Sequence, residues 1–334
     1  MGENASKRVT AADVARSLGV SRATVGFVLN NTPGQTISEP TRRRVLAEAE
    51  RLGYRPHRAA QDLRRGSSKI ILVVLPDLQM EYRLRQYLEE TSLALDEAGY
   101  SLAVYARQPV SRARPLWELL TPDVVLGIGP FSDEEAASMR ACGVTKIIPD
   151  PGQSETMDEA PTIIAGPALQ VEHLHDLGHR HLAFAATADP RASSLLQARA
   201  GAAQRTAARL GLDPLDVRAI EYRGDSAAAA VRHWHKAGVT GVVAYNDDVA
   251  AMMVGAAIRA GLSVPGDLAV IGHDDIPLAA VFVPSISSVS IDAAGLGRYF
   301  AAVALHVADG RPLPHRDFDS DATLVAREST VGNG

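Results

Sequence analysis

The chain has 334 residues, of which 46% are hydrophobic, and this is enough for two or three domains with sizeable cores. No apolar run reaches the length of a membrane span, and the N-terminus lacks the apolar segment of a signal peptide. A single cysteine, Cys142, excludes an internal disulfide framework, so we expect a cytoplasmic protein.

The net charge of −5 is distributed unevenly along the chain. Residues 1–66 contain 12 basic and 6 acidic residues, a net charge of +6, which leaves −11 for the rest of the chain. A basic head on an acidic body favours a head that binds a polyanion such as nucleic acid. From charge alone, the alternative is a chance bias of the solvated surface.

The first elements form a helix-turn-helix pattern. Thr10 is a suitable N-cap for a helix that begins at Ala11, and a glycine, Gly19, is suited to end it. Ser21 then caps a second helix. Sharply crossing helices need a small residue at the crossing, a glycine in the turn and a branched residue beyond it, and the chain meets these needs in order with Ala15, Gly19 and Val25. An ordinary helical hairpin is the alternative.

A third helix is expected over residues 38–52, ended by Gly53. The arginines at 42–44 are either a solvated face or phosphate contacts. A short, arginine-rich helix is expected to follow from Pro56, with Leu63 on its apolar face. Because so short a helix is marginal alone, we expect it to form only when something packs on it.

Apolar runs alternate with helical patterns from residue 69 onward. This alternation predicts an α/β body with two parallel sheets and a cleft between them, with ligands at the carboxyl ends of the strands. Strands are expected at 70–75, 101–105, 124–128, 146–148, 181–185, 217–222, 241–245 and 268–272. Helices are expected at 84–98, 133–142, 168–177, 193–210, 227–237, 247–260 and 293–307.

Several stretches resemble the lactose-repressor (LacI/GalR) family. The head and hinge match in VTAADVARSLGVSRATV and ISEPTRRRVLAEAERLGYRPHRAAQDLRRG, which together cover most of residues 9–66, and the regulatory core matches in VVAYNDDVAAMMVGAAIRAGLSVPGDLAVIGHDDIPLA and LVARES. The resemblance implies an all-α helix-turn-helix DNA-binding head and an α/β periplasmic-binding-protein-like body with two parallel-sheet subdomains. It also implies a homodimer on a pseudo-palindromic double-stranded DNA operator, and a hinge that folds on DNA with Leu63 wedged into the minor groove.

On this basis we expect three parts in the chain: a DNA-binding domain at 1–54, a hinge at 55–67 and an effector-binding and dimerisation body at 68–334. Within the body, the first subdomain combines about 68–162 with 291–320. The second combines 163–290 with 321–330.

The second helix departs from the family. Its common TVSRVLN is TVGFVLN here, which places Gly26 and Phe27 on the outward face. Arg22 can bond guanine bidentately, and Ala23 can meet a thymine methyl group. Phe27 either covers a thymine methyl group or folds back against the first helix. The expected DNA-binding residues are Thr10, Ser21, Arg22, Ala23, Thr24, Gly26, Phe27, Asn30, Arg55, His57, Arg58 and Leu63.

The resemblance places Asn246 and Asp274 in an effector cleft, although each is equally suited to cap the segment after its strand. The family's arginine three residues before a helix glycine is Ala198 here, and Arg199 is one step off. Ser226 stands where sugar-binding members often carry an aromatic ring, so we expect either an effector other than a simple hexose or an empty cleft. The expected effector-binding residues are Tyr82, Arg199, Asn246 and Asp274.

Other motifs do not indicate an enzyme. His173 and His175 lie on different faces of a helix and do not converge as metal ligands, and no G-x-S-x-G elbow or complete dinucleotide fingerprint is present. We therefore expect no metal, no cofactor and no catalysis. The sequence predicts a sequence-specific transcriptional regulator, a repressor, controlled by a small-molecule effector. The alternative is a small-molecule binding protein or an enzyme on the same body without a DNA role.

Overall fold

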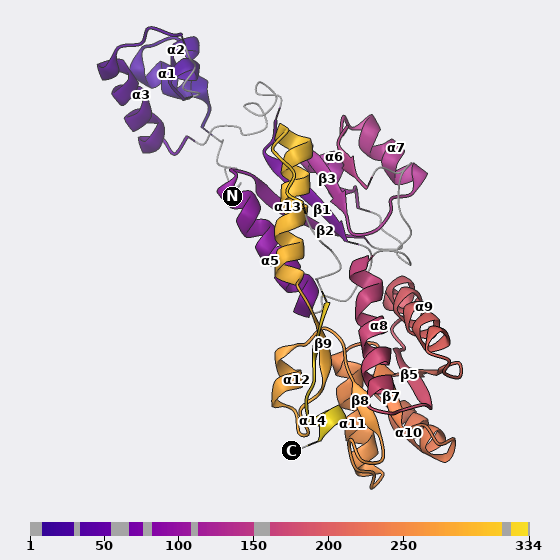
Figure 1. Ribbon diagram of the computed structural model, residues 1–334. Helices are drawn as coiled ribbons and strands as arrows, with labels where there is room; N and C mark the ends of the chain where they lie inside the picture. Colours follow the sequence, from indigo (N-terminus) through magenta and orange to yellow (C-terminus); the bar gives the residue numbers. More distant parts are fainter. Residues whose placement is uncertain are drawn as a thin grey trace, which may run out of the picture. The chain divides into compact units, whose positions relative to one another are not determined.

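The computed structural model describes residues 9–29, 34–54, 67–75, 82–107, 113–149, 161–315 and 322–332. It divides into two compact units, Met1–Lys69 and Ile70–Gly334. The first is all-helical and the second is α/β (Figure 1). None of the helices within these ranges is long and apolar enough to cross a membrane.

The head is a bundle of three helices, α1 (Ala11–Leu18), α2 (Arg22–Leu29) and α3 (Glu39–Arg51). Each helix contributes two side chains to a small apolar core, so none of them buries its face alone. The buried members are Val14, Ala15, Val25, Val28, Val45 and Ala49.

Local capping explains where the head helices begin and end. The backbone N–H and the hydroxyl of Thr10 both donate to the carboxylate of Asp13, at 2.9 and 2.6 Å, and this starts α1 as predicted. Gly19 adopts a left-handed φ of 62° and ends the helix. The Ser21 hydroxyl then accepts the backbone N–H of Thr24 at 3.0 Å and caps α2. The predicted turn chemistry is confirmed at all three positions.

The first subdomain of the body is built on a parallel sheet in the order β2-β1-β3-β4. Its central strand reads IILVVL and is buried almost throughout, as expected for a parallel strand covered on both faces. The strands are β1 (Ile70–Leu75), β2 (Ser101–Ala106), β3 (Val124–Gly127) and β4 (Ile147–Ile148). The helices are α5 (Tyr82–Glu97), α6 (Leu116–Leu120), α7 (Asp133–Ala141) and α13 (Ala293–Asp309).

The second subdomain has a parallel sheet in the order β6-β5-β7-β8, which repeats the pattern of the first. Its core is the larger of the two and includes the fully buried Trp234. The strands are β5 (Leu182–Thr187), β6 (Asp216–Ile220), β7 (Gly241–Ala244) and β8 (Ala269–Ile271). The helical segments are α8 (Pro161–Asp176), η2 (Pro190–Ala192), α9 (Ser193–Arg209), α10 (Ser226–Lys236), α11 (Asp247–Arg259), α12 (Pro277–Val281) and α14 (Glu328–Val331).

Two late segments connect the subdomains. β9 (Ser288–Ile291) pairs antiparallel with β10 (Ala322–Val325), and between them the chain returns to the first subdomain as α13. There α13 lies along α5 (Figure 1). The contact is close because Gly297 has no side chain, and a Cβ there would overlap the carbonyl oxygen of Tyr87.

The largest difference from a predicted boundary lies at the start of α8. Helix α8 begins at Pro161, whereas the sequence pattern placed its start at 168, just beyond Pro167. A proline inside a helix lacks the N–H for one backbone hydrogen bond, so Pro167 is unfavourable in the interior of α8. The helix nevertheless continues through Pro167, and its Gly166 lies so close to His273 that a Cβ would overlap the imidazole ring.

Candidate DNA-reading face and effector cleft

The outward face of α2 carries four of the predicted DNA-binding residues. Arg22 and Ala23 are exposed, and Gly26 and Phe27 are partly exposed. Val25, on the opposite side of the helix, is fully buried in the head core. The helix therefore presents one cation and a short apolar strip to its surroundings.

Phe27 is not among the side chains that pack on the head core within the described residues. Gly26 is equally unconstrained, because a Cβ at this position would meet no atom of the described chain within 4 Å. Of the predicted DNA contacts, Thr10, Ser21 and Thr24 are engaged in the capping described above. Five lie outside the described residues: Asn30, Arg55, His57, Arg58 and Leu63.

The four predicted effector residues come together in the body. Asn246 follows β7 and Asp274 follows β8, while Tyr82 begins α5 on the opposite subdomain. These three side chains line a cavity of about 60 Å³. The side-chain oxygen of Asn246 accepts the backbone N–H of Val249 at 2.9 Å, so this residue also caps α11.

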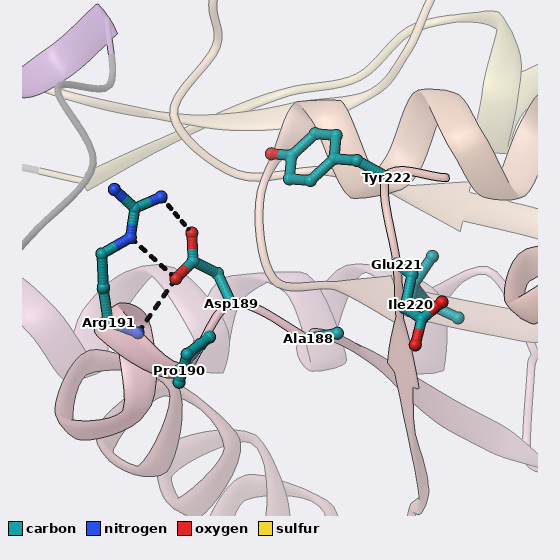
Figure 2. Close-up of a pocket in the computed structure, with 7 residues that line it drawn as sticks. All are labelled: Ala188, Asp189, Pro190, Arg191, Ile220, Glu221 and Tyr222. Carbon is teal, nitrogen blue, oxygen red and sulfur yellow. Dashed lines mark hydrogen bonds and ion pairs between the residues drawn. The ribbon is translucent and has the colours of Figure 1, made fainter. Parts of the chain in front are cut away.

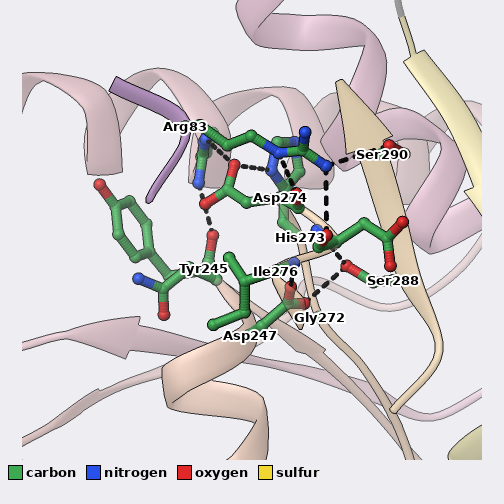
Figure 3. A network of polar contacts seen from close by, with 12 residues as sticks. Arg83, Tyr245, Asp247, Gly272, His273, Asp274, Ile276, Ser288 and Ser290 are labelled. Carbon is green, nitrogen blue, oxygen red and sulfur yellow. Dashed lines mark hydrogen bonds and ion pairs between the residues drawn. The ribbon is translucent and has the colours of Figure 1, made fainter. Parts of the chain in front are cut away.

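Arg199 reaches Asp274 although it stands one step from the expected position. Its guanidinium donates to a carboxylate oxygen of Asp274 at 3.0 Å and to the carbonyl of Tyr245 at 2.7 Å. Nδ1 of His273 contacts the same carboxylate oxygen at 2.7 Å (Figure 3). All three polar side chains are buried. Asp274 is thus satisfied by the protein's own side chains.

Neighbouring groups in this network determine which of its side chains carry a charge. Burial alone raises the pKa of Asp274, but the Arg199 guanidinium and the His273 ring outweigh it and hold that pKa well below its usual range. Burial lowers the pKa of His273, and Arg199 lowers it further, so the imidazole is neutral and donates from Nδ1. The site therefore contains a fixed carboxylate and a fixed guanidinium.

A second arginine bridges the two subdomains. Arg83, near the start of α5, donates to the carbonyl oxygens of Asp274 and Asp275 and, at 3.1 Å, to the hydroxyl of Ser290 in β9 (Figure 3). The two aspartates have φ values of 93° and 47°, a left-handed conformation that non-glycine residues rarely adopt. Arg327 also contacts this turn through an ion pair with Asp275 at 2.7 Å. Neither arginine was among the predicted site residues, although Arg327 lies in the family-like stretch LVARES.

Asp247 lies buried beside this turn. Its carboxylate accepts the Ser288 hydroxyl at 2.6 Å and the backbone N–H of Ile276 at 2.7 Å (Figure 3). It makes no ion pair among the described residues. Burial raises its pKa to about 7, and the charges of Asp274 and Asp275 add to this effect. A Cβ at Gly272 would overlap the carboxylate, so the glycine makes room for it.

A wider recess of about 450 Å³ opens at the carboxyl ends of β5 and β6 (Figure 2). Tyr222 presents its ring there and is half exposed, and Arg191 forms a two-pronged ion pair with Asp189. Ser226, expected in place of an aromatic platform, instead accepts the backbone N–H of Glu221 at 2.8 Å. Tyr222 was not among the predicted site residues, although an aromatic residue at the end of the strand predicted over 217–222 was the available signal.

The histidines of the HLHDLGHRH stretch have separate partners. His173 contacts the Thr330 hydroxyl at 2.8 Å, and His179 contacts the Thr240 hydroxyl at 2.9 Å. Within the described part of the chain, no group of three or more His, Cys, Asp or Glu side chains is placed to hold a metal ion. These contacts are structural.

A helix-turn-helix head followed by a two-subdomain body with a cleft at its strand ends defines a class of ligand-responsive transcription regulators. Two family models match in the corresponding places: "Bacterial regulatory proteins, lacI family" over residues 10–57 and "Periplasmic binding protein-like domain" over residues 171–330. The chain is 32% identical to the HTH-type transcriptional regulator MalR of Streptomyces coelicolor, with 96% of each chain covered. It is 27% identical to the lactose operon repressor of Escherichia coli, covering 97% of this chain and 91% of that one.

A crystal structure of the Lac repressor dimer, bound to operator and the anti-inducer ONPF, has the same fold, with a TM-score of 0.74, 24% identity and 97% and 99% of the two chains covered. The chain belongs to the lacI family of bacterial regulatory proteins and is a DNA-binding transcriptional regulator. The predicted family, fold class and regulatory role are confirmed.

Proposed function

We propose that the chain is a repressor that binds a pseudo-palindromic operator as a homodimer and responds to a small molecule bound in its body. The observation that carries this proposal is the outward face of α2, where Arg22 and Ala23 are exposed on a helix held by a packed three-helix core. In a helix-turn-helix protein, this helix enters the major groove. The relatives are transcription regulators. We therefore propose that the body binds its ligand without catalysing a reaction on it.

Arg22 gives the most direct test of DNA reading. A guanidinium can bond guanine bidentately, and each such contact is worth about 1–3 kcal/mol of discrimination. Arg22→Ala should therefore lose preference at one base position per half-site in a binding selection. Arg16→Ala is the control, because Arg16 lies on α1 and pairs with Asp13. An equal loss on every sequence would show that Arg22 contacts only phosphate.

Exposed apolar side chains support the homodimer. Val281 in α12 and Val283 just beyond it are 73% and 82% exposed, and Leu278 in the same segment is 45% exposed. Such a cluster marks an association surface. Val281→Asp should shift the protein towards monomer in sedimentation velocity, whereas Leu119→Asp, on the exposed face of α6, should not. A dimer that persists in Val281→Asp and in the double variant with Val283→Asp would contradict this interface.

The proposed function also depends on a division of the chain into a DNA-binding domain, a hinge and a body. We propose a DNA-binding domain at 1–54, a hinge at 55–67 that folds on DNA, and a body at 68–334 that dimerises. Leu63→Ala should weaken operator binding and reduce DNA bending while leaving the stability of the body unchanged. Hinge amides already protected from hydrogen exchange without DNA would refute the folding of the hinge on DNA.

The effector should differ from a simple hexose. The cavity at Tyr82, Asn246 and Asp274 is small, and Asp274 is already held by Arg199 and His273. A ligand at 100 times its Kd adds about 2.7 kcal/mol to stability, so a thermal-shift screen of metabolites can find it. A common hexose that stabilises the wild type strongly but not Asp274→Asn would contradict this expectation. No shift with any compound would favour an empty cleft.

A further inference from the structure

Gly26 is not required by the head itself. It is the fifth of eight residues in α2, its backbone is helical, and a Cβ there would meet nothing within 4 Å. Glycine in a helix interior is destabilising relative to alanine, because it loses more conformational freedom on folding. Neither backbone conformation nor crowding within the described head accounts for Gly26, so this position is free to serve a contact between α2 and another molecule.

Phe27 also lies outside the head core formed by the described residues. It is partly exposed and is not among the side chains that pack on this core within the described residues, whereas its neighbours Val25 and Val28 are buried in it. An aromatic ring cannot form the hydrogen bonds by which polar side chains read base edges. Together with exposed Ala23, Phe27 makes the strip on α2 apolar, with Arg22 beside it.

The major groove offers one apolar group on the base edges, the C5-methyl group of thymine. We propose that Gly26 and Phe27 form a methyl-reading surface, in which Gly26 lets the helix backbone approach the DNA and Phe27 packs on a thymine methyl group in each half-site. The inference rests on the proposed operator binding and adds a specificity rule. Each half-site requires a thymine opposite Phe27, next to the base that Arg22 reads.

The test begins with full-length protein and a randomised DNA library, from which bound sequences are selected. In the best sequence, each thymine of a half-site is then replaced in turn by deoxyuridine, which removes only the methyl group. Burial of one methyl group is worth about a fourfold change in affinity. In each half-site, we expect one of these replacements to weaken wild-type binding about fourfold. Making that replacement in both half-sites should weaken binding about 15-fold.

Variants assign the effect to the surface. At the thymine position assigned to Phe27, Phe27→Ala should bind thymine and deoxyuridine operators equally, and Arg16→Ala should discriminate as the wild type does. Gly26→Ala should raise the melting temperature of the head and still weaken binding to the selected DNA. This opposite response of stability and affinity separates a role in DNA contact from a role in folding. If Phe27→Ala does not fold, Phe27→Gln provides the same comparison, because it replaces the apolar ring with a polar side chain.

The outcomes are distinguishable. Selection of no preferred sequence would overturn the proposed operator binding and this inference with it. A selected sequence in which every deoxyuridine replacement is tolerated by the wild type would overturn the methyl-reading surface alone. Gly26→Ala that binds as tightly as the wild type would refute the close approach at this position.

Discussion

Asp247→Asn should stabilise the protein at neutral pH and change its response to pH. The carboxylate is buried and accepts hydrogen bonds from Ser288 and from the backbone of Ile276, without an ion pair among the described residues. Asparagine has the same shape and mimics the protonated acid, because its NH₂ can donate to the Ser288 hydroxyl while its oxygen accepts from Ile276. The substitution therefore removes a buried charge and retains the packing.

The size and direction of the effect follow from the pKa. Burial raises the pKa of Asp247 from 3.8 to about 7 in the folded chain. Between these values the unfolded chain holds fewer protons at this site than the folded chain, so the free energy of unfolding falls as pH rises. The penalty is absent below pH 3.8 and complete above pH 7. At 1.36 kcal/mol per pKa unit, it reaches about 4 kcal/mol.

The assay is urea unfolding of the wild type and Asp247→Asn at several values between pH 4.5 and 7.5, followed by circular dichroism. The stability of the variant relative to the wild type should increase across this range by a few kcal/mol, because contributions from all other groups cancel. Asp96→Asn is the control, since that side chain is exposed on α5, and its difference from the wild type should stay flat. A flat difference for Asp247→Asn would refute the raised pKa.

Three further substitutions test other contacts. Arg83→Ala should speed hydrogen exchange of the amides at 274–276, because it removes the bridge to the Asp274 and Asp275 carbonyls, whereas Arg85→Ala, which alters only an exposed side chain, should leave them unchanged. Equal exchange in both would contradict the bridge. Arg199→Met should lower the free energy of unfolding by about 3–5 kcal/mol, because it leaves the Asp274 carboxylate buried without its cation; a loss below 1 kcal/mol in urea unfolding would refute that reasoning. Gly297→Ala should lower the melting temperature at a cost of about 1–3 kcal/mol, since the added Cβ overlaps the Tyr87 carbonyl, and an unchanged melting temperature would show that α5 and α13 separate easily.

The head could be predicted almost to the residue because its signals are local. Thr10, Gly19 and Ser21 each act on backbone groups within three to five residues, and the structure shows these caps. The parallel strands were equally predictable, because strands buried on both faces appear as continuous apolar runs such as IILVVL. Short elements such as α12 and β9 were missed, since segments of four or five residues carry too little periodicity.

The cleft was only partly predictable, because its contacts join residues far apart in the chain. Asn246 and Asp274 were found from the resemblance to the family, which agrees with their places at strand ends, and Arg199 was chosen despite its unusual position. Arg83 was missed, since nothing around it indicates that its guanidinium contacts carbonyl groups 191 and 192 residues away. Tyr222 was passed over because the family pattern directed attention to Ser226. A contact between two subdomains joins residues far apart in the chain, so no local pattern of hydrophobic residues predicts it.

The pairing of β9 with β10 has a mechanical consequence for the body. The chain passes between the subdomains three times, once between β4 and α8 and again on either side of α13. The last two passages are joined by the antiparallel ladder that runs from Ile291 opposite Ala322 to Ser288 opposite Val325. They cannot move independently without breaking that ladder, so they form a single two-stranded ribbon. The described strands that join the halves of the body therefore move together as one unit.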